Sequence, residues 1–147
     1  MKEVYTDGAC RNNQAPGGQL GGWACVFVDG PSYSGADPST TNNRMEMTAV
    51  IEALKHTATG TDVTVYSDSA YVINAFVQNW FRGWEKRGWK NAKGQPVENQ
   101  DLWRQLQSLV QDRHVHWVKV KGHSGNVMNE RADQLAVAAM STLADSR

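Results

Sequence analysis

Four acidic side chains are placed where they could together bind a divalent cation. Asp7 and Asp68 each follow a short β-branched and aromatic run, so both are expected at the carboxyl end of a strand, where open α/β sheets bind ligands. Glu46 and Asp133 fall within helical patterns later in the chain. Hard cations such as Mg²⁺ prefer carboxylate oxygens, and two such ions stabilise the attacking and leaving oxygens of a phosphodiester. The four acids therefore predict a metal site suited to phosphodiester hydrolysis.

The helical pattern around Glu46 strengthens this interpretation. Positions 46, 49, 50, 53 and 54 share one helical face, and the other four carry Ala, Val or Leu. Glu46 should therefore face the core, where an unpaired carboxylate is costly, so we expect a partner such as Arg44 or a cation. Asp133 lies at the margin of the apolar stripe of the closing helix.

Each acid also has an ordinary structural interpretation. Asp7 could be a turn aspartate, and Asp68 could be the N-cap of the helix that follows it. Glu46 could lie exposed in the first turn of its helix, where the helix dipole favours an anion. Asp133 could be solvated and pair with Arg131 or Arg147.

A basic, tryptophan-rich stretch over residues 80–93 provides a second candidate site. It contains three tryptophans, five basic residues and one acid, in a chain whose formal net charge is zero. Cations and aromatic rings side by side suit contact with a nucleic-acid backbone and its bases. The alternative is a solvated helix whose tryptophans pack inward. We expect both features, with tryptophans partly buried and cations facing outward.

His123 lies in a loop flanked by Gly122 and Gly125. An unperturbed histidine has a pKa of about 6.5, which suits proton transfer at neutral pH. A single loop histidine more often has no special role, so the sequence pattern alone leaves its function open.

The apolar pattern predicts a mixed sheet with helices packed on it. Strands are expected at 4–6, 23–28, 33–36, 63–66 and 115–120. Helices are expected near 44–56, 69–79, 101–111 and 127–143. The first three strands should form antiparallel hairpins, and the later strands should cross over through helices.

Length and composition indicate an ordinary single domain over residues 1–147. Cys10 and Cys25 have no zinc-site spacing and are too few for a disulfide framework, which favours a reduced, cytoplasmic location. The chain has no apolar signal region and no membrane-length apolar run. We expect a monomer with no membrane contact.

Five motifs, in order along the chain, resemble the bacterial ribonuclease HI family. They are Tyr5-Thr-Asp-Gly-Ala-Cys10, Asn42-Asn-Arg-Met-Glu-Met47, Tyr66-Ser-Asp-Ser69, Val120-Lys-Gly-His-Ser-Gly125 and Asn129-Glu-Arg-Ala-Asp133. The resemblance covers nearly the whole chain. It implies a ribonuclease H-like α/β fold, with a five-stranded mixed sheet ordered 3-2-1-4-5 flanked by helices, and a basic protrusion at about residues 80–99.

The resemblance also implies an activity and a cofactor. The activity is endonucleolytic hydrolysis of the RNA strand of RNA–DNA hybrids by a two-metal mechanism, leaving 3′-hydroxyl and 5′-phosphate ends. The cofactor is Mg²⁺, with Mn²⁺ as a substitute. The expected partner is the hybrid duplex.

Individual roles follow from the positions that match the family's motifs. The matches to the metal-binding catalytic acids are Asp7, Glu46, Asp68 and Asp133, and His123 matches a mobile catalytic histidine. The expected contacts to the RNA strand are Cys10, Asn13, Asn42 and Asn43. A DNA-strand phosphate is expected near Thr41, Arg44 and Asn99, and the protrusion should grip the DNA strand through Trp80, Trp84, Lys86 and Arg87.

Some positions depart from the family's pattern. Ala70 and Asn74 stand where an enterobacterial form has glutamines, which puts some RNA-strand contacts in doubt. The loop 11–15 lacks the family's usual Gly-Asn-Pro. The neutral net charge predicts weaker binding at raised salt than in more basic relatives.

Two other functions remain possible at this point. The chain could bind hybrids without cleaving them, although clustered acids beside a phosphate would then bring no benefit. It could instead be a transposase- or integrase-like relative that acts on DNA, although such proteins need no basic protrusion.

Overall fold

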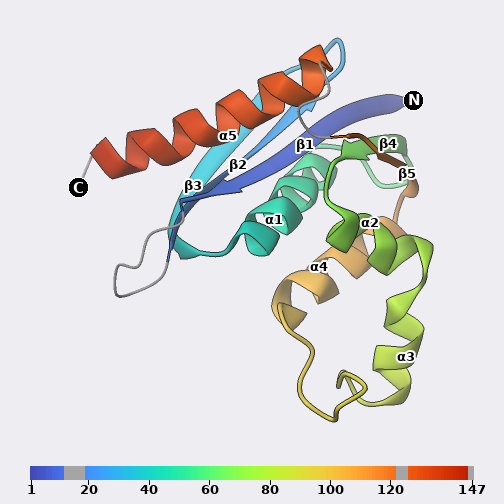
Figure 1. Cartoon of the computed structure of the whole chain (residues 1–147). Coiled ribbons are helices and arrows are strands. Elements are labelled where there is room, and N and C mark those ends of the chain that lie inside the picture. The colour runs from blue at the N-terminus through green and yellow to red at the C-terminus, as the bar shows by residue number, and fades with distance from the viewer. Residues whose placement is uncertain (12–18, 122–125, 146–147) are drawn as a thin grey trace.

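The computed structural model describes residues 1–11, 19–121 and 126–145. One mixed sheet has the strand order β3-β2-β1-β4-β5, which confirms the expected topology (Figure 1). Its strands are β1 (Lys2–Cys10), β2 (Gln19–Phe27), β3 (Ser32–Thr40), β4 (Asp62–Ser67) and β5 (His114–Lys119). The β1–β2 and β2–β3 pairs are antiparallel, whereas β1–β4 and β4–β5 are parallel.

The first three strands are longer than the sequence pattern predicted. β1 continues past Asp7 and pairs with β2 as far as Cys10, opposite Gly21. The second strand was expected to begin at residue 23, but β2 begins at Gln19 and includes Gly21 and Gly22. Glycine at position 22 lets a helix pack directly against the strand. A Cβ atom at Gly22 would overlap the carbonyl oxygen of Ala136 in the closing helix.

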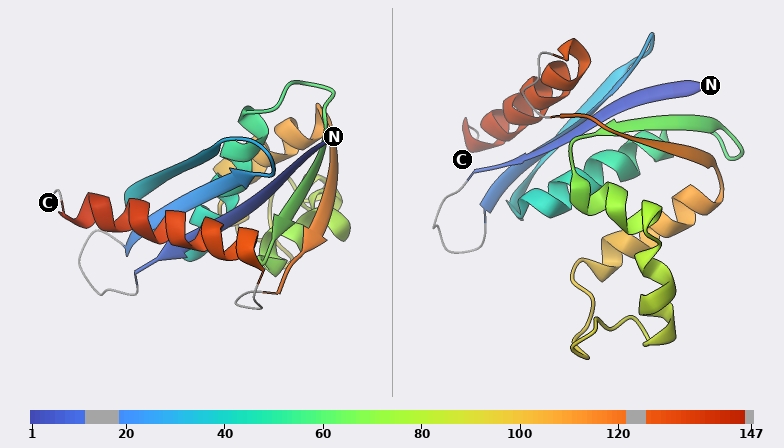
Figure 2. Two further views of the ribbon diagram at one scale, coloured as in Figure 1. Left: turned by 90° about the horizontal axis from the view of Figure 1, so that it is seen from above. Right: turned by 45° about the vertical axis from the view of Figure 1, so that its right-hand side comes forward.

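Helices cover both faces of the sheet (Figure 2). α5 (Val127–Asp145) crosses β1, β2 and β3 on one face, and the opposite face carries α1 (Asn42–Lys55). α2 (Ala70–Val77), α3 (Trp80–Lys86) and α4 (Gln100–Gln111) lie on the same side as α1. The single helix predicted over 69–79 ends early, because Asn79 adopts a left-handed conformation, with φ of 52°, between α2 and α3.

The core lies between the sheet, α1 and α4. Trp103 is completely buried there, with Val50, Leu54 and Leu106. Phe81 of α3 packs its ring 5.7 Å from Trp103, centroid to centroid, and so anchors the basic stretch to the body of the molecule. Within the described part of the chain, none of the helices is both long and apolar enough to cross a bilayer.

Candidate active site

The backbone of Gly8 makes hydrogen bonds to both Asp7 and Glu46. Its backbone N–H donates to Asp7 Oδ1 at 2.9 Å and to Glu46 Oε1 at 2.7 Å. Asp7 lies within β1, paired opposite Ala24, so the turn interpretation of this residue is wrong. A strand and a helix separated by more than thirty residues therefore share one hydrogen-bond donor.

The contact between β1 and α1 requires glycine at position 8. A Cβ atom there would lie 2.5 Å from the carbonyl carbon of Met45 and closer still to the backbone nitrogen of Glu46. Both are backbone atoms, so no side-chain rotation could relieve the overlap. The absence of a side chain at Gly8 therefore lets the first turns of α1 lie directly on β1 and brings Glu46 to Asp7.

Gly8→Ala should consequently separate α1 from β1 and displace Glu46. We expect a loss of about 2 kcal/mol or more in the free energy of unfolding, since overpacking costs about 1–3 kcal/mol. Cleavage of RNA–DNA hybrid, the activity that the resemblance implies, should fall at least about tenfold, because a small displacement of a catalytic group is costly. Urea denaturation and an initial-rate assay measure the two effects. Gly30→Ala is the matched control, because its Cβ would meet the Phe27 side chain at 3.1 Å and no backbone atom closer than 4.0 Å. An unchanged Gly8→Ala protein would contradict this account.

Glu46 is only 5% exposed, and its Oε2 atom has no hydrogen-bond partner. The predicted core-facing position is confirmed, and the alternative of an exposed first-turn acid is wrong. The expected pairing with Arg44 is also wrong, because the guanidinium of Arg44 instead contacts Asp101. Of the two partners anticipated for Glu46, only a cation remains.

Asp68 follows the end of β4 and does not cap the next helix. The N-cap of α2 is Ser69, whose Oγ accepts from the backbone N–H of Val72 at 3.2 Å. Ser67 Oγ accepts from Ser69 N–H at 3.0 Å and fixes the backbone on both sides of Asp68. The N-cap interpretation is therefore wrong, and the carboxylate is available to the site.

The four acids meet in one pocket. One oxygen each from Asp7, Glu46 and Asp68 lies within 4.8 Å of the other two. Asp133, from α5, lines the same pocket without joining this tight group, and within the described residues no ion pair links it to Arg131. One pocket is thus lined by acids from within β1, from just after β4 and from helices on both faces of the sheet.

Burial disfavours the ionised forms of two of these acids and so raises their pKa values. Burial, with a contribution from the negative charge of nearby Asp68, raises the pKa of Asp7 to about 7. Burial also raises the pKa of Glu46 well above its usual value, with Asp7 contributing repulsion. The site offers hard oxygen donors, and one of them, Glu46 Oε2, has no hydrogen-bond partner. A divalent cation would bind these oxygens and relieve the repulsion between the carboxylates.

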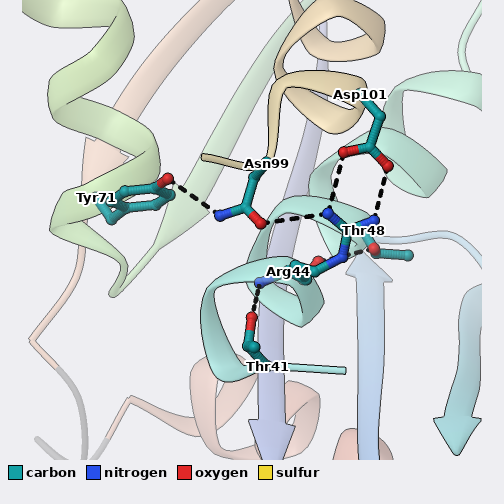
Figure 3. A network of polar contacts seen from close by, with 6 residues as sticks. All are labelled: Thr41, Arg44, Thr48, Tyr71, Asn99 and Asp101. Atoms are coloured by element: carbon teal, nitrogen blue, oxygen red, sulfur yellow. Dashed lines mark hydrogen bonds and ion pairs between the residues drawn. The ribbon is translucent and has the colours of Figure 1, made fainter. Parts of the chain in front are cut away.

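The residues expected to meet a DNA-strand phosphate form a network at the start of α1 (Figure 3). Thr41 caps the helix, its Oγ1 accepting from Arg44 N–H at 3.2 Å. The guanidinium of Arg44 donates to Asp101 at 3.0 and 2.7 Å and to Asn99 Oδ1 at 3.2 Å. Sequence reasoning had no signal for the role of Asp101, which lies in the first turn of α4.

The residues expected on the RNA side are only partly described. Asn42 and Asn43 are exposed at the start of α1 and line the acid pocket. Cys10 is half-buried, with its thiol 3.0 Å from Gln19 Oε1. Asn13 and His123 lie outside the described residues, so their predicted roles stay predictions.

The basic stretch has the expected division between buried rings and exposed cations. Trp80 and Trp84 are half-buried, and Trp84 packs 5.6 Å from the Trp103 ring, centroid to centroid. Lys86 and Arg87 are exposed. The tryptophans therefore support the stretch, and the cations face solvent.

Four polar residues that line the pocket were not among the predicted site residues: Ser69, Tyr71, Asn129 and Glu130. Asn129 is 4% exposed, lines the pocket, and has an Oδ1 atom with no hydrogen-bond partner. Tyr71 lines the pocket from α2. Their burial and position depend on tertiary packing, for which the local sequence pattern contains no signal.

Comparison with known sequences gives a consistent family match. A sequence model of the RNase H family matches residues 1–141. The ribonuclease H of Moorella thermoacetica is 53% identical over 148 residues, covering 97% of this chain and 95% of that protein. The ribonuclease H of Symbiobacterium thermophilum is 50% identical over 145 residues, covering 95% of this chain and 96% of that protein.

Comparison with solved structures agrees. The crystal structure of LC9-RNase H1, a type 1 RNase H with the type 2 active-site motif, matches with a TM-score of 0.82 and 33% identity, covering 96% of this chain and 72% of that one. A foamy viral protease-reverse transcriptase in complex with RNA/DNA hybrid matches with a TM-score of 0.79 at 20% identity, covering 96% of this chain and 20% of that one. The viral likeness concerns the fold alone.

Proposed function

The chain belongs to the ribonuclease H family, and we propose that Asp7, Glu46, Asp68 and Asp133 form its catalytic centre. The protein is an endoribonuclease that hydrolyses the RNA strand of RNA–DNA hybrids, leaving 3′-hydroxyl and 5′-phosphate ends. The observation that carries the site assignment is the gathering of three carboxylate oxygens within 4.8 Å, in a pocket that Asp133 also lines.

The side chains of the pocket have separable roles. Asp7 and Glu46 are held in register by the N–H of Gly8, which leaves one oxygen of Glu46 directed to no protein group. Asp68 adds a third hard oxygen donor within 4.8 Å, and Asp133 lines the same pocket. Divalent cations bound by these acids supply Lewis-acid stabilisation of the attacking and leaving oxygens of the scissile phosphodiester. The enzyme is therefore dependent on divalent metal, and we propose Mg²⁺ as the metal, with Mn²⁺ as a substitute.

We propose the nucleic-acid contacts from the positions that match the family's motifs. Exposed amides at the start of α1 suit the 2′-hydroxyls of an RNA strand, which distinguish RNA from DNA. The proposed RNA-side residues are Cys10, Asn13, Asn42 and Asn43. A DNA phosphate is proposed at Thr41, Arg44 and Asn99, and His123 is proposed to move a proton during hydrolysis or product release. One domain over 1–147, a monomeric state and a cytoplasmic location stay predictions.

The protrusion at 80–99 is proposed to grip the DNA strand through Trp80, Trp84, Lys86 and Arg87. Replacing both cations with alanine should weaken hybrid binding. It should also reduce the slope of log K against log salt by about 1 to 2, because each phosphate contact contributes about 0.9. Binding titrations at several salt concentrations measure this slope.

Lys55→Ala serves as the control for this double variant. Lys55 is an exposed cation in the last turn of α1, next to Glu52 at 3.6 Å. Its loss should leave the slope unchanged. An equal drop in slope for Lys55→Ala would mean that overall charge, and not the protrusion, governs binding.

One gel tests the proposed function. Labelled RNA–DNA hybrid, duplex DNA and duplex RNA are each incubated with Mg²⁺ and, separately, with a chelator. We expect cleavage of the hybrid's RNA strand only, and only with Mg²⁺. Cleavage of duplex DNA would favour a DNA-acting relative, and binding of the hybrid without cleavage would favour a binding module.

A further inference from the structure

A chain of hydrogen bonds runs from the buried core to the cation of Arg44. Trp103 Nε1 lies 3.2 Å from the Tyr71 hydroxyl, and Asn99 Nδ2 lies 3.2 Å from the same oxygen. On its other side, Asn99 Oδ1 accepts from Arg44 Nη1 at 3.2 Å. Figure 3 shows Tyr71 and Arg44 on opposite sides of the Asn99 amide. Helices α1, α2 and α4 each contribute one or two of these residues.

The donor and acceptor in each of these hydrogen bonds follow from the two end groups of the series, the Trp103 indole and the Arg44 guanidinium. Arginine has only donors, so the atom of Asn99 that faces Arg44 must be the carbonyl oxygen. The amide nitrogen then faces Tyr71. The indole of Trp103 is also a donor only, so the Tyr71 hydroxyl accepts from both neighbours. The Tyr71 hydroxyl therefore holds the amide nitrogen of Asn99 and reinforces the orientation in which the carbonyl oxygen meets the guanidinium.

The backbone of Asn99 supports a specialised role for its side chain. Asn99 occupies the N-cap position of α4, where asparagine usually accepts a hydrogen bond from the helix. Its side chain makes no such bond, and its φ of 60° is left-handed. Non-glycine residues in this conformation are uncommon and often mark functional positions. The Asn99 amide instead bonds to Arg44 and Tyr71, and it makes no capping hydrogen bond to the start of α4.

We propose that Tyr71 is a positioning residue for hybrid binding: its hydroxyl orients the Asn99 amide, which with Asp101 holds the Arg44 guanidinium ready for a nucleic-acid phosphate. Asp101 fixes one edge of the guanidinium through two N–H groups, and Asn99 takes a further N–H of Nη1. Among the described residues, Nε–H and the second N–H of Nη2 have no partner, and they remain for a phosphate. Because Tyr71 also lines the acid pocket, it connects the two parts of the substrate site.

The proposal rests on the proposed hybrid nuclease function, and Tyr71→Phe tests it. Phenylalanine keeps the ring that packs 5.1 Å from Trp103 and removes only the hydroxyl. We expect the KM for hybrid to rise about three- to tenfold with kcat within about twofold, because one hydrogen bond and not the chemical step is affected. In an Asn99→Ala background, which should itself raise KM at least as much, Tyr71→Phe should have no further effect.

Together, Tyr71→Phe in the wild-type and Asn99→Ala backgrounds forms a double-mutant cycle, and each of its outcomes supports or overturns the role of Tyr71. An unchanged KM with a lower Tm would make Tyr71 a purely structural residue. An equal rise in both backgrounds would mean that Tyr71 does not act through Asn99. Tyr66→Phe is the matched control, since it removes a hydroxyl that donates to Glu3 Oε1 at 2.7 Å, outside this network, and should leave KM unchanged. A wild-type protein that cleaves no hybrid would instead refute the proposed function.

Discussion

Asp7→Asn should reduce hybrid cleavage by about 10³-fold or more while changing hybrid affinity only a few-fold. The substitution removes one charged oxygen donor from the three that lie within 4.8 Å of one another. Stabilisation of transition-state charge by bound cations is worth several kcal/mol, and about 1.4 kcal/mol corresponds to a factor of ten in rate. Asparagine keeps the carbonyl oxygen that accepts from Gly8 N–H, so the local backbone should be preserved.

Affinity should survive because the proposed binding contacts lie elsewhere, on the start of α1 and on the protrusion. Single-turnover cleavage and equilibrium titration of labelled hybrid separate the two quantities. Asp62→Asn is the matched control, since Asp62 is exposed at the opposite end of β4 from Asp68. If Asp7→Asn cleaved hybrid at the wild-type rate, the proposed catalytic centre would be wrong.

A mixed sheet with helices packed on it, and the positions of Asp7, Glu46 and Asp68, could be predicted because their signals are local, whereas the strand order came from the family resemblance. β-branched runs predict strands, an acid directly after such a run predicts a site at the sheet edge, and the helical period places Glu46 on the buried face. The structure confirms the buried position of Glu46 and brings Asp7 and Asp68 to it. Prediction worked where one residue's environment follows from its immediate neighbours.

Other features depend on contacts between distant segments and left no local signal. The second strand was expected to begin only at residue 23, yet Gly21 and Gly22 lie in β2, and the absence of a Cβ atom at Gly22 lets α5 lie directly on this strand. Arg44 is two residues from Glu46 but pairs with Asp101, fifty-seven residues away. Asn79 and Asn99 adopt left-handed conformations that asparagine tolerates but does not require. Tertiary packing determines these conformations and partners, so the sequence pattern could not predict the helix break at Asn79 or the network at Arg44.

Asp7→Asn should also raise the free energy of unfolding when no divalent cation is present. Asp7 has a pKa of about 7 in the folded protein against 3.8 for an unburied group, mainly because of burial. Between these values the folded state holds a proton that the unfolded state has lost, so stability falls as pH rises from about 4 to about 7. At pH 8 in chelator, Asp7→Asn should exceed wild type by on the order of 2 kcal/mol in the free energy of unfolding.

Urea denaturation at pH 4 and pH 8 tests this sign directly. The gain from Asp7→Asn should be large at pH 8 and small at pH 4, where the wild-type carboxyl is protonated in the folded state. Saturating Mg²⁺ should narrow the gap at pH 8, because a bound cation relieves in the wild type the repulsion that the substitution removes. Asp62→Asn, exposed and remote, should show no comparable pH-dependent gain. A wild-type protein that is more stable than Asp7→Asn at pH 8 in chelator would mean that the acids do not repel, and the physical basis for a cation at this site would be lost.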